Sequence, residues 1–587
     1  MRQSFKQLIG YLLPYKIQFG FVCIIVVIAN ILSLRIPYIT GQMVDAIGLG
    51  TGKVDFDFIM KGSISILAIA AFTWALSVVQ NLLMLKTAQS VVLDLRHDVF
   101  SRLLRLPVAY FDGTTKGNII SIISTDIDNI SETVSADVIT LLTGGVTVVS
   151  ALGFMLEISG WMTCIFIVTV PMMFISAKFI SRKSRVLFRS KKTDYGELCG
   201  YAEEMITAQK TVKVYGIEEY NKENFFGISG RLKQSGSKAE TMSSMLMPSM
   251  NAINNLNFTL ICIIGTILVL KGELSIGSIS TFVLYSKRFA GPIIDTANVM
   301  NMFQVALAAC DRVFGILNHE VEKDEPTLSL DTCKPIQEVK GEVVFQDVSF
   351  TYDGASEVLK HINLTIKPGE KIAIVGATGS GKTTLISLLM RFYDVTEGCI
   401  QIDGVDIRQM PLDYLRQHFA MVLQESWLFG GSIYENISYG IKTEGIDKER
   451  IQALCEEIGV DEFISALPNG YDTLLTGDLG SLSAGQKQLI NIARTFMCNP
   501  PLYILDEATS SVDPLTEIKI KEVTDKVTKG KTSFIIAHRL STILEADRIL
   551  VMKDGQIVEQ GNHEELLTQG GLYKELYESQ FISDLQT

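Results

Sequence analysis

The stretch Gly376–Thr384 has the residue types and the spacing of a phosphate-binding loop. It reads GATGSGKTT, fits the pattern G-x-x-x-x-G-K-[ST], and lies between an apolar run and a helix-like run. Glycines in such a loop let backbone N–H groups close around phosphate oxygens, and the N-terminus of the following helix adds a favourable dipole. Lys382 can reach the β- and γ-phosphates of a nucleotide, and Thr383 can offer its hydroxyl to Mg²⁺. A tight turn that matches the pattern by chance is the alternative interpretation.

Two adjacent acids, Asp506 and Glu507, end a second apolar run in the stretch PLYILDEATSSVD. One carboxylate can join a Mg²⁺ shell while the next lies beside an attacking water, which suits phosphoryl transfer. His538 ends another apolar run and could contact a γ-phosphate, Gln424 could connect Mg²⁺ and water to a neighbouring segment, and Tyr352 could stack on adenine. Taken singly, these residues are also typical of a solvated strand end, a structural histidine, a polar surface and a core aromatic.

The elements that must position this chemistry form a domain that we place at residues 338–587. Its apolar runs alternate with helical patterns, which predicts an α/β sheet with an antiparallel edge. The expected strands are EVVFQDVSFTY, HINLTIK, KIAIVG, LYILD and SFIIAH. A charged, proline-containing linker at residues 317–337 precedes this domain.

Residues 1–316 are predicted to form a membrane domain with six helices and long cytosolic loops. The mean hydropathy of the chain is +0.28 although 20% of its residues are charged, because the apolar residues are crowded into the first half. A run of about 20 apolar residues is the length that an α-helix needs to cross the hydrocarbon core. Such runs lie at approximately Gln18–Thr40, Gly62–Leu85, Val134–Leu156, Trp161–Ile180, Met245–Leu270 and Leu274–Met300. The basic opening of the chain predicts an interfacial helix before a retained first span.

The distribution of cations predicts the orientation in the membrane. The segment Arg182–Ala239 carries twelve lysines and arginines, whereas the expected outer loops hold only Lys53, Lys61 and Lys271. This excess places the long connections, both termini and the second domain in the cytosol. The connections at 86–133 and 181–244 have helical patterns and are expected to extend the membrane helices as paired rods.

Net charge and cysteine content exclude two classes of protein. The formal net charge of −12 gives no basic footprint for nucleic acid. Nine cysteines occur without a CxxC pair, so a disulfide framework is not expected.

With these motifs in this order, the chain resembles the ATP-binding cassette (ABC) family, in the exporter branch that fuses six membrane helices to one nucleotide-binding domain. The resemblance covers essentially all 587 residues. It implies an α-helical polytopic membrane domain followed by an α/β P-loop ATPase domain, which contains an antiparallel β subdomain and a helical subdomain. It also implies ATP and Mg²⁺ as cofactors, and ATP hydrolysis coupled to transport.

The resemblance assigns roles to individual residues. Gly376–Thr384 correspond to Walker A, LSAGQ at Leu482–Gln486 to the signature loop, and Asp513 to the D-loop acid. Catalytic roles fall on Glu507 as general base, His538 as switch histidine and Gln424 in the Q-loop. The implied metal ligands are Thr383, Gln424 and the Walker B residue Asp506. The implied nucleotide contacts are Tyr352, Gly376, Thr378, Gly379, Ser380, Gly381, Lys382, Thr383, Thr384, Ser483, Gly485, Gln486 and Asp513.

The signature loop implies a partner subunit. In the family, two nucleotide-binding domains stack head to tail, so that Ser483 and the Gly485 amide would touch the γ-phosphate held by the partner. The loop carries Ala484 where most members have glycine, and Asp478 stands where many relatives have glutamate. Together with an intact Walker B and histidine, these differences resemble the catalytically complete half of a bacterial heterodimeric multidrug-type exporter, and YSKRFAGPIIDTANVMN in the sixth span is similar to that half too. We therefore expect a heterodimer in preference to the homodimer that closed symmetry would favour by default.

Two further expectations concern coupling and substrate. Family resemblance assigns the helices that dock on the cassettes to Phe111–Ile120 and Tyr215–Asn224, which could also be ordinary rod ends. Arg35, Lys287 and Arg288 lie inside expected spans, where charges usually face a cavity or a partner. Asp295 is a possible counter-ion, and an internal salt bridge or a snorkelling lysine is the alternative.

Three functions are compatible with the sequence. The first is export of amphipathic compounds, lipids or peptides across the cytoplasmic membrane by alternating access. The second is import on the same fold, as in similar siderophore transporters. The third is a regulatory or channel-like protein that ATP gates, and an intact Glu507 and His538 favour active turnover over this interpretation.

Overall fold

A computed structural model describes residues 2–47, 54–322, 339–352, 354, 356–423, 426–440, 447–475, 482–506, 514–537 and 543–581. The chain forms two compact units. One, here called the helical unit, comprises residues 1–105 and 114–320, and the other, the sheet unit, comprises residues 106–113 and 321–587. The backbone therefore passes between the units at three points, after Arg105, Gly113 and Glu320.

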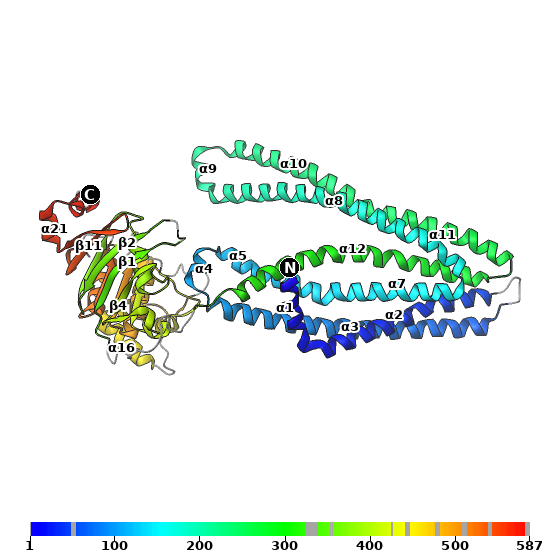
Figure 1. Cartoon of the computed structure of the whole chain (residues 1–587), viewed down its shortest axis with the longest axis horizontal. Coiled ribbons are helices and arrows are strands. Elements are labelled where there is room, and N and C mark those ends of the chain that lie inside the picture. Colours follow the sequence, from blue (N-terminus) through cyan, green and yellow to red (C-terminus); the bar gives the residue numbers. More distant parts are fainter. Residues whose placement is uncertain are drawn as a thin grey trace. The chain divides into compact units, whose positions relative to one another are not determined.

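The helical unit consists of helices, several of which are long. They are α1 (Arg2–Leu12), α2 (Lys16–Asp45), α3 (Phe56–Leu103), α5 (Lys116–Ser121), α6 (Ile127–Glu132), α7 (Val138–Ile158), α8 (Gly160–Thr207), α9 (Gln209–Tyr215), α10 (Glu218–Ser244), α11 (Leu246–Leu270) and α12 (Ile276–Asn318). Figure 1 shows α2, α3, α7 and α12 packed together, while α8 forms a hairpin with α10 and α11. Because α3 and α8 each run for 48 residues, they continue well beyond their apolar spans, as the predicted rods require.

Within the described residues, five helical stretches are long and apolar enough to cross a membrane. They are Ser4–Asp45, Phe56–Leu103, Lys116–Ile158, Gly160–Thr207 and Glu218–Leu270. These stretches contain the first five predicted spans. The sixth predicted span lies in α12, whose 43 residues are sufficient to cross, and its assignment as a span stays a prediction.

An ion pair between the half-exposed Arg312 and the buried Asp126 connects α12 to the helices that precede α7. The Nε atom of Arg312 donates to Asp126 Oδ2 at 2.6 Å, and a second guanidinium nitrogen donates to Asp126 Oδ1. Asp126 is only 1% exposed. Loss of Arg312 would leave the buried Asp126 carboxylate without its cation, so this contact helps to hold the two elements together.

The sheet unit contains two larger sheets. The first is antiparallel, in the order β2-β1-β4-β5, formed by β1 (Val343–Phe350), β2 (Leu359–Ile366), β4 (Glu397–Ile402) and β5 (Val405–Asp406). The second has the order β12-β11-β3-β10-β9-β6. Its strands are β3 (Lys371–Val375), β6 (Phe419–Val422), β9 (Leu502–Asp506), β10 (Thr532–Ile536), β11 (Arg548–Lys553) and β12 (Gln556–Gly561). Among these described strands only β12 is antiparallel to its neighbour. The predicted α/β sheet is present and contains the expected strands KIAIVG, LYILD and SFIIAH, whereas the first two expected strands belong to the separate antiparallel sheet.

Helices complete the sheet unit. They are α4 (Val108–Asp112), α13 (Lys382–Leu389), α14 (Leu412–Gln417), α15 (Ile433–Ser438), α16 (Lys448–Ile458), α17 (Asp461–Ser465), α18 (Ala484–Cys498), α19 (Pro514–Thr528), α21 (His563–Gln569) and α22 (Leu572–Leu576). One buried core joins both larger sheets to α13, and a second joins β6, β9 and β10 to the helices from α15 to α19. The predicted β and helical subdomains are thus both present. The linker predicted at 317–337 begins within α12 and continues into residues 323–338, which lie outside the described part.

Candidate functional site

The predicted phosphate-binding loop connects β3 to α13, as the motif requires. Gly376 has a φ of 155°, and a Cβ there would lie 2.3 Å from the Met552 carbonyl oxygen on β11. Gly381 has a φ of 101°, and a Cβ there would lie 2.6 Å from Leu359 Cδ2. Neither position has room for a side chain. The glycines therefore shape the cradle, and α13 presents its N-terminus to it.

Two polar side chains converge inside this cradle. Lys382 is 8% exposed, and its Nζ atom donates to the carbonyl oxygens of Gly376 at 2.7 Å and Ala377 at 3.0 Å. Burial lowers the pKa of Lys382, and the charge of Asp506 opposes that shift. Ser380 is 5% exposed, and its Oγ atom is buried without a hydrogen-bond partner among the described residues. A buried cation beside an unsatisfied hydroxyl fits a phosphate group.

The parallel strands bring the other predicted residues to the same edge as this loop. β9 ends at Asp506, and β9 and β3 are the two neighbours of β10. The carboxyl ends of parallel strands meet at one edge of a sheet, which is where phosphate and metal ligands are usually placed. Asp506 acts electrostatically on Lys382 across this edge.

Four predicted site residues cannot be placed at this edge of the sheet, because the structure does not describe them. Gln424, Glu507, Asp513 and His538 lie outside the described residues, and so does Asp478. Their assignments stay predictions. The strands that precede Gln424, Glu507 and His538 are β6, β9 and β10, and each of these strands is described.

Tyr352 lies directly beyond β1 with a half-exposed ring. Its hydroxyl forms a 3.0 Å hydrogen bond with Thr384 Oγ1 on α13. The ring meets Phe350 edge-on at 4.8 Å and Tyr393 edge-on at 5.0 Å between centroids. Because 52% of the residue is exposed, the free ring face can take a stacked base.

The signature loop is built as a helix cap. Ser483 Oγ accepts from the Gln486 amide at 3.2 Å, and Gln486 Oε1 accepts from the Ser483 amide at 2.9 Å. This capping box starts α18, whose first residue is Ala484. Ala484 therefore sits in a helical turn, where alanine is favourable, so its Cβ is compatible with the local backbone. Ser483 and Ala484 are both exposed, and Gly485 is buried.

The two predicted coupling segments fall in different units. In Phe111–Ile120, the first residues belong to α4 of the sheet unit, and the later ones belong to α5 of the helical unit. Asp112, the last residue of α4, accepts a hydrogen bond from the Tyr393 hydroxyl. The sequence could not identify Tyr393, because its partner is 281 positions away. Tyr215–Asn224 lie at the turn between α9 and α10 of the helical unit.

Two of the cations inside the predicted spans, Arg288 and Arg35, have a polar and an aromatic neighbour respectively. Arg288 donates to Ser33 Oγ at 3.2 Å. The Arg35 guanidinium lies over the Phe154 ring at 6.0 Å. Phe154 stacks on Tyr285 with 6.1 Å between centroids and 9° between planes, and the Tyr285 hydroxyl donates to the Leu34 carbonyl at 2.7 Å.

No ion pair involving these cations is found in the described part of the chain. Arg35, Lys287 and Arg288 have no carboxylate within salt-bridge distance there, and the proposed counter-ion Asp295 pairs with none of them. Arg35 and Lys287 are exposed on the surface of the helical unit. A charge exposed to lipid is costly, so these side chains are predicted to face a watery cavity or a partner, and a snorkelling Lys287 stays the alternative.

Comparison with known proteins agrees with this architecture. Residues 19–293 match the model of the ABC transporter transmembrane region, and residues 359–510 match that of the ABC transporter. The chain is 39% identical over 579 residues to an uncharacterized ABC transporter ATP-binding protein, YfiC, of Bacillus subtilis, with 98% of this chain and 94% of that protein covered.

The names of two further relatives mention a substrate. The chain is 40% identical over 510 residues to a fatty acid ABC transporter ATP-binding/permease protein of Mycobacterium bovis, with 87% and 79% of the two chains covered. It is 32% identical over 582 residues to an ATP-dependent lipid A-core flippase of Vibrio vulnificus, with 99% and 98% covered.

Proposed function

The chain belongs to the ABC transporters, as an exporter-type half-transporter with an ATPase coupled to transport, and from this premise we propose that it exports a lipid-like amphipathic compound. The main support for the proposal is that a single chain joins helices long and apolar enough to cross a membrane to a loop shaped to bind phosphate. Its relatives named for fatty acid and for lipid A-core support an amphipathic substrate.

ATP would occupy the cradle between β3 and α13. We propose Mg²⁺ as its cofactor, held by the hydroxyl of Thr383 and the carboxylate of Asp506, which are the hard oxygen ligands that this ion prefers. When bound, the ion would neutralise charge on the β- and γ-phosphate oxygens. Lys382 and the N-terminus of α13 would hold the phosphates, and Tyr352 would hold the adenine.

We further propose that two halves assemble, with a heterodimer preferred over a homodimer. Ser483 and Ala484 are exposed at the N-terminus of α18, where backbone N–H groups and the helix dipole favour an anion. An anion at this place would be the γ-phosphate held by the partner's cradle. The sequence differences at Ala484 and Asp478 are the basis for preferring two unlike halves.

The cations in the predicted spans indicate which part of the substrate the helical unit would bind. Arg35 and Arg288 are held in place by Phe154 and Ser33. A cavity lined by these groups would favour an anionic head group, such as a carboxylate or phosphate, beside an apolar tail. The proposed location is the cytoplasmic membrane, with multiple passes and with both termini and the ATPase domain in the cytosol.

Transport into inside-out membrane vesicles tests the proposal. A radiolabelled long-chain fatty acid serves as the anionic probe, and a cationic amphiphilic dye serves as its comparison. We expect ATP-dependent accumulation of the fatty acid, and none with Lys382→Ala. Uptake in right-side-out vesicles only would establish import. Nucleotide-dependent leakage down a gradient, with no accumulation, would establish gating; either result overturns export.

A further inference from the structure

One face of α8 carries a line of cations that begins at the cytosolic end of the predicted fourth span. That span is predicted to end at Ile180, and α8 continues without a break to Thr207. The cations, here called the basic stripe, follow one another at intervals of four, three, four and three residues and are Lys178, Arg182, Arg185, Arg189 and Lys192. With 3.6 residues per turn, these positions lie within about 80° of one another and extend over about 21 Å. All five residues are exposed.

The basic stripe lies away from the packed side of α8. That side is formed by the buried residues Met173, Ala177, Ile180 and Ser184. Met173 and Ala177 pack against α11, and Lys191, on the same side, pairs with Glu240 of α10 at 2.7 Å. Figure 1 shows α10 and α11 running along α8. The stripe is centred about 130° around the helix from these buried residues, so the neighbouring helices leave it uncovered.

The basic stripe has no acidic partner among the described residues. α8 contains no aspartate or glutamate from Gly160 to Thr193, and no ion pair joins the stripe to another described element. Like charges three or four residues apart on a helix repel one another, so an anion from outside the helical unit would stabilise α8.

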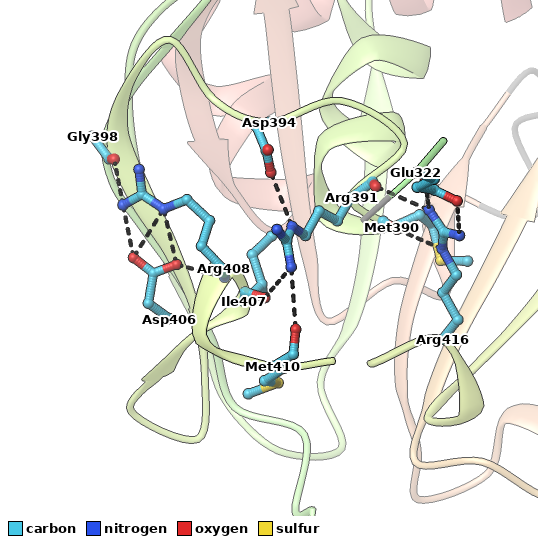
Figure 2. A network of polar contacts seen from close by, with 10 residues as sticks. All are labelled: Glu322, Met390, Arg391, Asp394, Gly398, Asp406, Ile407, Arg408, Met410 and Arg416. Carbon is cyan, nitrogen blue, oxygen red and sulfur yellow. Dashed lines mark hydrogen bonds and ion pairs between the residues drawn. The ribbon is translucent and has the colours of Figure 1, made fainter. Parts of the chain in front are cut away.

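Arginines of the sheet unit are placed differently. Figure 2 shows three of them with carboxylate partners, which are Arg391 with Asp394 at 2.9 Å, Arg408 with Asp406 at 2.7 Å and Arg416 with Glu322 at 2.6 Å. The chain therefore supplies its own acids where an arginine stabilises the fold, and it supplies none to the basic stripe.

The same face of α8 is apolar within the predicted span. Ile167, Phe174 and Ile175 are exposed and lie within about 60° of the centre of the stripe. Each head-group region of a bilayer is about 5–7 Å thick, so the long side chains from Lys178 to Arg185 can reach it. The excess of cations in cytosolic loops accounts for their number, but it does not require their alignment below an apolar face.

We propose that the basic stripe binds acidic phospholipids of the cytosolic leaflet. Their phosphates would lie against the cations, and their acyl chains would lie against Ile167, Phe174 and Ile175. The lipid is a bound ligand that offsets the repulsion within the stripe, and it is not the transported compound. The inference goes beyond the proposed transport function and does not depend on it. The competing occupants are the transported amphiphile and acidic groups of a partner half.

Native mass spectrometry of the full chain, with any partner half that copurifies, measures lipid binding in detergent. The protein is titrated with dioleoylphosphatidylglycerol, which has an anionic head group, or with dioleoylphosphatidylcholine, which has the same acyl chains and no net charge. We expect tighter binding of phosphatidylglycerol. This preference should disappear in about 1 M ammonium acetate, where charges act over only about 3 Å.

Three double variants test the stripe. A cation near an anionic membrane surface contributes about fivefold to binding, so Arg182→Gln with Arg185→Gln should weaken phosphatidylglycerol binding about 25-fold. Arg182→Lys with Arg185→Lys keeps both charges and should bind like the parent. The matched control, Lys210→Gln with Lys233→Gln, removes the same charge from exposed positions on α9 and α10, and it should also bind like the parent.

Hydrogen–deuterium exchange in nanodiscs locates the bound lipid. Residues 178–192 should exchange more slowly in phosphatidylglycerol than in phosphatidylcholine, and the double glutamine variant of the stripe should lose this difference. Unchanged lipid affinity in that variant, or an equal loss in the control, would overturn the proposal. Equal exchange in the two lipids would assign this face to a partner half or to solvent. Displacement of phosphatidylglycerol by an equimolar long-chain fatty acid would assign it to the transported compound, and either result refutes a retained lipid.

Discussion

Replacement of Gly376 by alanine should cost more nucleotide affinity than replacement of Gly379 in the same loop. A Cβ on Gly376 would lie 2.3 Å from the Met552 carbonyl oxygen, and β3 and β11 cannot separate there without breaking their parallel ladder. Overpacking of this kind costs about 1–3 kcal/mol, to which the backbone strain adds about 1–2 kcal/mol. Gly379 has a φ of 84°, but a Cβ there would meet no atom of the described residues within 4 Å. Only the strain of about 1–2 kcal/mol therefore applies at Gly379.

A variant loop can relax in the free protein and must regain the strained shape to hold ATP, so these costs appear as lost affinity. At 1.4 kcal/mol for each tenfold change, Gly376→Ala should weaken ATP binding about 30-fold or more, and Gly379→Ala about 5- to 30-fold. Equilibrium binding of ATP to the full chain in nanodiscs measures both values, and thermal unfolding of the same samples shows whether the sheet unit remains folded. Equal losses from the two variants, or a larger loss from Gly379→Ala, would refute the argument from the 2.3 Å approach.

Three further outcomes are expected. Lys382→Ala should abolish ATP-driven transport while membrane insertion persists, because Lys382 is predicted to bind the phosphates; normal transport by this variant would refute the P-loop assignment. Neutralising Arg35 and Arg288 to glutamine should shift the preference among transported amphiphiles away from anionic ones, and an unchanged profile in competition assays would favour pairing of these cations with a partner subunit. In a heterodimer, Glu507→Gln should lower ATP turnover by about 10² or more whereas Ser483→Ala costs much less, and equal losses from both variants would support a homodimer.

Much of the fold could be predicted because its signals are local. The phosphate-binding loop depends on glycines and a lysine within nine residues, and both its flanking strand and its helix lie where the motif requires. Apolar length alone identified the first five spans. Alternation of apolar strands and helices was sufficient to predict the sheet, since parallel strands and their crossover helices leave this pattern.

The remaining features depend on contacts between distant residues, which the sequence does not display. Tyr393 looks like any aromatic after a helix until Asp112 is brought to it. The segment Phe111–Ile120 reads as continuous, yet its two halves belong to different compact units. The hydrogen bond between Tyr352 and Thr384 joins a strand end to a helix through tertiary packing alone. The roles of Gln424, Glu507, Asp513 and His538 stay predictions, because these residues lie outside the described part.

The capping hydrogen bonds of Ser483 bear on whether another residue could replace serine at this position. A serine hydroxyl has two lone pairs and one proton, and the cap uses a lone pair, since Ser483 Oγ accepts from the Gln486 amide. The proton is left for an acceptor outside the helix. If Ser483 binds the predicted anion, helix stability and anion recognition would use different parts of one hydroxyl and would not compete. Aspartate would cap α18 equally well, but it has no proton to give and brings a negative charge, so the preference for a hydroxyl here would be set by the neighbouring subunit's phosphate and not by the helix it begins.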